Sequence, residues 1–73
     1  MEKSLMMLLI EEDEAVKEYN ASKNVLEMDL QLDFGEMKEE IIKGDTAQMI
    51  RDREQMENAR QAIRDYFRKL NKI

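Results

Sequence analysis

The sequence predicts an all-α protein, an antiparallel helical hairpin that is completed as a bundle by self-association or by a partner. Its 73 residues include no Pro and only two Gly, and residues that favour helices dominate. A seven-residue apolar repeat runs through the last third of the chain. A chain this short buries only about 60% of its unfolded surface. Because it has no Cys or His for disulfides or zinc ligands, association is the remaining way to complete the fold.

A first helix is expected over about residues 5–43. Apolar residues recur along it at spacings of three, four or seven, which places them on one helix face: Val16, Tyr19, Leu26, Leu30, Phe34, Met37 and Ile41. This stripe passes through Gly35, where the helix is weakest and can break. A second stripe lies roughly opposite and contains Val25, Met28, Leu32 and Ile42. Because a two-helix hairpin covers only one stripe, the second predicts an interaction surface.

A β-strand is the alternative for part of this segment. Apolar and polar residues alternate strictly from Leu26 to Phe34, as they do in half-buried strands, and Gly35 would end such a strand. The helix is favoured because Leu, Met, Asp and Glu are indifferent or poor strand formers. A lone strand would also need a partner to pair with.

A turn is expected at residues 44–45, followed by a second helix over about residues 46–71. Gly44 suits the position after a helix end, and Asp45 is a good N-cap with Gln48 three residues later. The heptad repeat of this helix has apolar residues at its a and d positions, interrupted only by Asp52: Met49, Met56, Ala59, Ile63, Tyr66, Leu70 and Ile73. Residues 1–73 are therefore expected to form a single helical domain.

Charge is distributed unevenly between the two halves. Residues 1–45 hold thirteen acidic and five basic side chains, a net charge of −8, whereas residues 46–73 hold four acidic and seven basic, a net charge of +3. The acidic total argues against binding of a nucleic-acid backbone as the main task. Four arginines lie near one side of the second helix: Arg53, Arg60, Arg64 and Arg68. We expect them to face the acidic first helix or to flank the heptad residues.

The residue types present offer little chemistry. Without His or Cys, nucleophilic catalysis by a Cys–His or Ser–His pair is excluded, and the spacing of zinc ligands is absent. We therefore expect no enzyme, no cofactor, no metal site and no small-molecule substrate. The apolar run Leu5–Ile10 is too short to span a bilayer and lacks the flanks of a signal peptide. The expected location is the cytoplasm, with no membrane partner.

Nine apolar residues are the predicted partner-binding residues. On the second helix they are Met56, Ile63, Tyr66, Phe67 and Leu70, and the residues expected opposite them are Leu30, Phe34, Met37 and Ile41. Tyr66 and Phe67 are the expected hot spots, because aromatic side chains supply much contact area at low entropic cost.

Residues 26–70 resemble the small helical-hairpin co-chaperones of bacterial type III secretion systems. The matching features are the two-helix plan and the stretch from Lys38 to Asp45, in which a helix ends in a basic residue and Gly before a second amphipathic helix. The resemblance implies a non-enzymatic protein that pairs with a tetratricopeptide-like chaperone and keeps a needle subunit unpolymerised in the cytoplasm.

The function expected from the sequence is that of a non-enzymatic adaptor or chaperone. It would bury an apolar helical face against another protein or against a second copy of itself, as a coiled coil or a helix in a groove. Two alternatives stay open. One is a small transcriptional, phage or antitoxin-type regulator, and the other is a homo-oligomeric helical bundle with a structural role.

Overall fold

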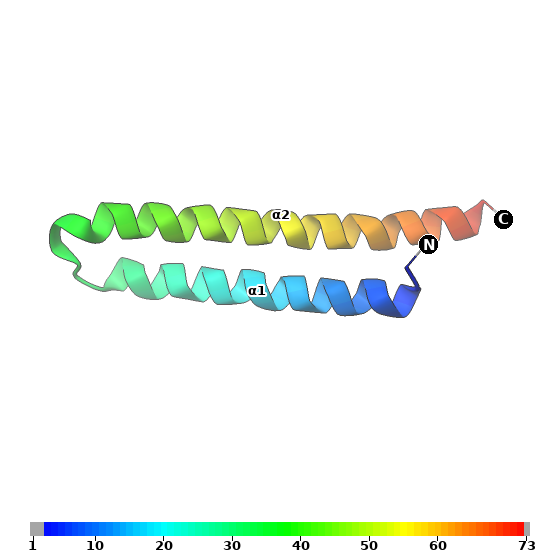
Figure 1. Ribbon diagram of the computed structural model, residues 1–73, viewed down its shortest axis with the longest axis horizontal. Helices are drawn as coiled ribbons and strands as arrows, with labels where there is room; N and C mark the ends of the chain where they lie inside the picture. Colours follow the sequence, from blue (N-terminus) through cyan, green and yellow to red (C-terminus); the bar gives the residue numbers. More distant parts are fainter. Residues whose placement is uncertain (1–2, 73) are drawn as a thin grey trace.

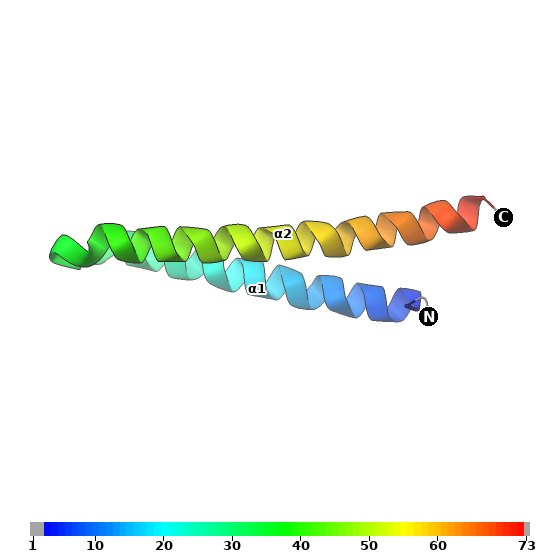
Figure 2. The same cartoon turned by 45° about the horizontal axis from the view of Figure 1, so that its top comes forward.

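A computed structural model describes residues 3–72 as two long helices joined by a tight connection. Helix α1 spans Leu5–Gln31, a short 3-10 turn η1 spans Gly35–Met37, and helix α2 spans Lys38–Asn71. The helices run antiparallel and side by side along their length (Figures 1 and 2). Within residues 3–72 there is no strand, so the prediction of an all-α helical hairpin is confirmed.

Local sequence explains where α1 begins and ends. The Ser4 hydroxyl is its N-cap and accepts a hydrogen bond from the Met7 amide at 3.2 Å. After Gln31 the chain turns because the Asp33 carboxylate accepts the Gly35 amide at 3.0 Å, and Gly35 adopts a φ of 60°, which costs glycine little. The Lys38 ammonium then donates to the Leu30 carbonyl at 3.0 Å, so a residue of α2 satisfies an orphan acceptor at the end of α1.

The predicted turn at residues 44–45 is wrong, and with it the bounds of the predicted helices 5–43 and 46–71, because the chain turns at the break that the sequence allowed near Gly35. Gly44 has ordinary helical geometry inside α2, and Asp45 lies in the same helix instead of capping it. With a turn at residues 44–45, the first helix would be about 13 residues longer than the second. The excess would have no helix to pack against, and a single unpacked helix is only marginally stable in water. The observed helices have 27 and 34 residues, so more of each is paired. This pairing offsets the roughly 1 kcal/mol cost of a helical glycine.

The strand alternative is also settled by the position of the turn. Residues 26–31 are the last turns of α1, and residues 32–34 belong to the connection. The backbone groups of residues 26–31 are hydrogen-bonded within α1, so this segment needs no partner strand.

The contact between the helices follows a heptad pattern on both sides. On α1 most of the residues that are buried or half-buried recur at alternating spacings of three and four: Leu5, Leu8, Glu12, Ala15, Tyr19, Ser22, Leu26 and Asp29. On α2 the matching set follows the predicted repeat and includes Asp52: Asp45, Met49, Asp52, Met56, Ala59, Ile63 and Tyr66. We call these two sets the seam. Ile73, which the repeat also included, lies outside the described residues.

The seam is thin and the molecule is elongated. Only Leu8, Ala15 and Met56 are buried apolar residues among those described, and each remains 6–8% exposed. The molecule measures 59 × 19 × 15 Å, and its radius of gyration of 16.7 Å exceeds the roughly 11 Å of a compact chain of this length. Two helices cannot enclose a core, so much apolar surface is left outside.

Candidate partner-binding surface

Exposed apolar side chains gather at the two ends of the hairpin. The loop end, where the chain turns, exposes Val25, Met28, Leu30, Leu32 and Met37. The open end, where both termini lie (Figure 1), exposes Met6, Met7, Leu9, Ile10, Phe67 and Leu70. Between the two ends, Ile50 alone among the described large apolar residues is comparably exposed. Met28 and Met37 are 64% and 65% exposed, so most of their side-chain surface makes no contact within the hairpin.

The outer surface of α1 carries the second stripe that the sequence predicts. Val25, Met28 and Leu32 follow one another at spacings of three and four and are all exposed. Ile42 does not belong with them, because the chain turns before it and places it half-buried on α2. Going back along α1, the same spacing reaches exposed Ile10 and Met7 near the start of the helix. We call Met7, Ile10, Ala21, Val25, Met28 and Leu32 the outer stripe.

The nine predicted partner-binding residues are divided between the seam and the surface. Met56 is only 6% exposed and belongs to the seam. The half-buried members are Phe34, Ile41, Ile63 and Tyr66, and the exposed members are Leu30, Met37, Phe67 and Leu70. Tyr66 and Phe67 pack edge to face with ring centroids 5.7 Å apart.

The expected pairing of these residues across the hairpin is wrong. Phe34, Met37 and Ile41 lie at the loop end, whereas Ile63, Tyr66, Phe67 and Leu70 lie toward the open end. The early turn at Gly35 is the reason, because it sets the start of α1 against the last turns of α2. Figure 2 shows that the end of α2 extends past the start of α1. Phe67 is exposed because it follows the half-buried Tyr66 by one residue and so points about 100° away from it around the helix, and Leu70 is also exposed.

A buried polar cluster occupies the middle of the seam. Asp52, the residue that interrupts the predicted repeat, is only 7% exposed. It accepts hydrogen bonds from the Ser22 hydroxyl of α1 and, at 3.1 Å, from the Gln48 side-chain amide one turn earlier on α2. The sequence signal for this cluster was the interruption itself, because a carboxylate at a heptad position must be paired or exposed.

Two carboxylates face each other closer to the loop end. The neighbouring Asp29 carboxyl of α1, with which Asp45 can share a proton, raises the pKa of Asp45 on α2, and partial burial adds to this effect. The Asp45 Oδ2 atom is buried without a hydrogen-bond partner among the described residues. Asp45 therefore resists ionisation while the helices are in contact. Sequence reasoning missed it because the pairing depends on the turn position.

The charges of the two helices meet toward the open end. Arg60 of α2 lies 3.8 Å from the Glu12 carboxylate of α1, as expected for an arginine facing the acidic first helix. Arg64 donates two hydrogen bonds to Gln61, and Arg68 lies 3.8 Å from Asp65, so both are held along α2. Such exposed contacts contribute little to stability, but they orient the side chains.

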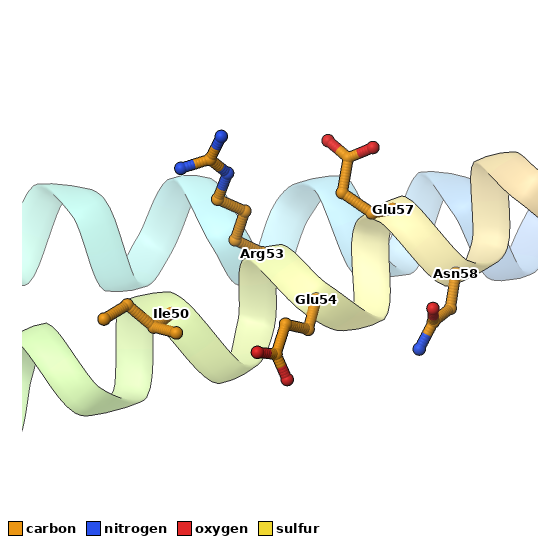
Figure 3. Close-up of a pocket in the computed structure, with 5 residues that line it drawn as sticks. All are labelled: Ile50, Arg53, Glu54, Glu57 and Asn58. Atoms are coloured by element: carbon orange, nitrogen blue, oxygen red, sulfur yellow. The ribbon is translucent and has the colours of Figure 1, made fainter.

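A shallow depression lies on the outer surface of α2. It is lined by Ile50, Arg53, Glu54, Glu57 and Asn58 (Figure 3). All five side chains come from one helix and point outward, with Arg53 and Glu57 toward one side. Because a single helix forms it, this depression does not enclose a ligand as a catalytic cleft does.

Searches for other kinds of site give negative results over the described part of the chain. No group of three or more acidic side chains there is placed to hold a metal ion. Neither α1 nor α2 is long and apolar enough to cross a membrane. Comparisons with protein-family models, with curated protein sequences and with solved structures find no match to this chain.

Proposed function

We propose that the protein is a non-enzymatic binding module whose exposed apolar ends are buried against another polypeptide. The observation that carries the proposal is the exposure of apolar side chains at both ends of a hairpin whose middle is polar. Contiguous apolar surface on a soluble helix is typical of interaction sites, whereas isolated apolar residues are not.

Methionines are prominent in this surface. The sequence holds seven Met, and those at positions 6, 7, 28 and 37 are exposed. The Met side chain is unbranched and polarizable, so it adapts to irregular partners and is common at binding faces with varied ligands. An adaptor or chaperone that masks an apolar helix on another protein is the role that this composition favours.

The narrower form of the proposal is the co-chaperone role implied by the resemblance to type III secretion proteins. It is supported by the helical-hairpin plan and by the exposed apolar ends. The turn from Lys43 to Asp45 gives it no support, because that stretch is helical.

The proposal is tested by affinity capture with the tagged protein from extracts of its source. The variant M28Q/L32Q changes two exposed loop-end residues, and I50Q is the matched control because Ile50 is equally apolar and lies between the ends. We expect the wild type and I50Q to retain the same polypeptide and M28Q/L32Q to retain at least about tenfold less, as loss of buried apolar contacts predicts. Equal recovery by both variants, or retention by none of the three, would contradict the proposal.

A further inference from the structure

Three methionines are the most exposed large apolar residues that the structure describes. Met6, Met37 and Met28 are 72%, 65% and 64% exposed, whereas the exposed Leu, Ile, Val and Phe side chains range from 47% to 52%. Met7 is 51% exposed, so each end of the hairpin carries two exposed methionines. We call these four residues the end methionines. Their side chains are open to small molecules in the solvent.

The methionines of the seam are sheltered by contrast. Met56 is only 6% exposed, and Met49 is half-buried. The chain holds no Cys, whose thiolate is the other protein sulfur that peroxides oxidise. Because susceptibility to oxidation follows exposure, an oxidant in the solvent should react with the end methionines before it reacts with Met56. The fold thus separates sulfurs that can be modified from the one that lies between the helices.

The reaction at each end methionine is a two-electron oxidation by hydrogen peroxide. The thioether sulfur attacks one peroxide oxygen, so an S–O bond forms and the O–O bond breaks. The departing hydroxide takes the proton of the transferred hydroxyl group, and the products are methionine sulfoxide and water. The sulfur is oxidised and the peroxide is reduced. The product side chain is polar where the thioether was apolar.

We propose that the end methionines are oxidation sites whose conversion to sulfoxide releases the bound polypeptide while the hairpin stays folded. This inference rests on the proposed function and adds its regulation. A partner that buries these side chains would have to desolvate each sulfoxide, which disfavours binding. The hairpin itself loses little, because more than half of each end methionine is already in contact with water. Met6, Met7 and Met28 also lie in the first and last turns of α1, where local opening costs least.

Limited oxidation of the tagged protein tests the inference. The protein is treated with hydrogen peroxide, which is removed with catalase before the extract is added, so that the partner is never oxidised. Peptide mass spectrometry measures sulfoxide at each methionine, circular dichroism measures helicity, and affinity capture from extracts of its source measures binding. The variant M6L/M7L/M28L/M37L is the matched control, because Leu keeps the apolar volume and has no sulfur.

We expect each end methionine to oxidise at least about fivefold faster than Met56, with helicity unchanged until Met56 reacts. Wild type that is oxidised only at the end methionines should retain at least about tenfold less of the captured polypeptide. Reduction by methionine sulfoxide reductases of both stereospecificities should restore binding. The quadruple Leu variant should capture the same polypeptide equally well before and after peroxide treatment.

Three outcomes would overturn the inference: oxidation of Met56 as fast as that of the end methionines, loss of helicity in step with their oxidation, or capture that survives their complete oxidation. Failure of the reductases to restore binding would also overturn it, whether or not the quadruple Leu variant captures the polypeptide. A loss of capture on peroxide treatment of that variant would place the effect outside the end methionines. Each of these results leaves the proposed function standing, because the untreated wild type still captures its partner. An untreated wild type that captures nothing would refute the proposed function and this regulation together.

Discussion

The middle of the hairpin and its two ends differ in the side chains that they bury and expose. In the middle, the buried residues at which α1 and α2 meet are a small residue, Ala15, one large apolar residue, Met56, and a hydrogen-bonded carboxylate, Asp52. At the ends, larger apolar side chains such as Met28 and Met37 remain exposed. Several of the largest apolar side chains of this protein therefore do not hold its two helices together.

The largest expected effect is a difference in unfolding free energy when the same substitution, Met to Gln, is made in the middle and at one end. Replacing Met56 with Gln buries an amide without a partner, and we expect the free energy of unfolding to fall by about 2–4 kcal/mol. The same change at Met28, which is exposed, should alter it by less than about 0.5 kcal/mol. Both values come from urea unfolding followed by circular dichroism at a concentration where the wild type is monomeric. Equal losses at the two sites would remove the distinction between seam and ends.

The polar cluster of the seam gives the next largest effect. Asp52→Ala leaves the Ser22 hydroxyl and the Gln48 amide without their acceptor, so we expect a loss of about 1–3 kcal/mol in unfolding free energy. The double variant S22A/D52A should lose less than the sum of the single variants, because the two groups act as a pair. Asp65→Ala is the control, since its hydrogen bond with Gln61 is exposed. Additive losses would show that Ser22 and Asp52 stabilise the fold independently.

The two glycines should respond in opposite directions. Gly44→Ala meets no atom within 4 Å and replaces a helical glycine, so we expect a gain of about 0.5–1 kcal/mol in unfolding free energy. Gly35→Ala places a side chain at a φ of 60°, and we expect a loss of about 1 kcal/mol. Thermal unfolding measures both. A loss at Gly44 would mean that the turn lies there and not at Gly35.

The smallest expected effect is a pH dependence from the Asp29 and Asp45 pair. Because the pKa of Asp45 is raised on folding, the folded state binds this proton more tightly than the unfolded state. The stability that the pair contributes is therefore present at low pH and is lost as pH rises above 3.8, the ordinary value. Relative to Asp45→Asn, the wild type should lose stability as the pH rises above 3.8. Urea midpoints measured at several pH values check this, and parallel curves for the two proteins would contradict it.

The fold class could be predicted because its signals are repeated many times along the chain. One face of α2 carries the heptad residues, and a single polar residue among them does not obscure the repeat: Met49, Met56, Ala59, Ile63 and Tyr66. The turn could not be predicted from its local signals, because Gly35 and Gly44 both stand beside residues typical of helix ends. The choice between them depends on how much of each helix finds a partner, which is a property of the whole chain.

Part of the candidate surface could also be predicted from the repeated apolar pattern of the sequence. The exposed stripe of Val25, Met28 and Leu32 follows from helical spacing alone. The exposure of Leu70 does not, because Leu70 is a heptad residue whose burial depends on where α1 begins. The buried Asp52 could be recognised only as an interruption until the position of Ser22 across the seam was known.

The hydrogen bond between Ser22 and Asp52 also limits sliding of the helices. Two heptad surfaces fit each other nearly as well after a shift of seven residues, since the same positions face the seam again. Such a shift in this hairpin would set Asp52 against Ala15 or against the carboxylate of Asp29, and neither can donate a hydrogen bond to it at neutral pH. This one polar contact thus fixes the alignment of the two helices, which their heptad pattern alone would not fix.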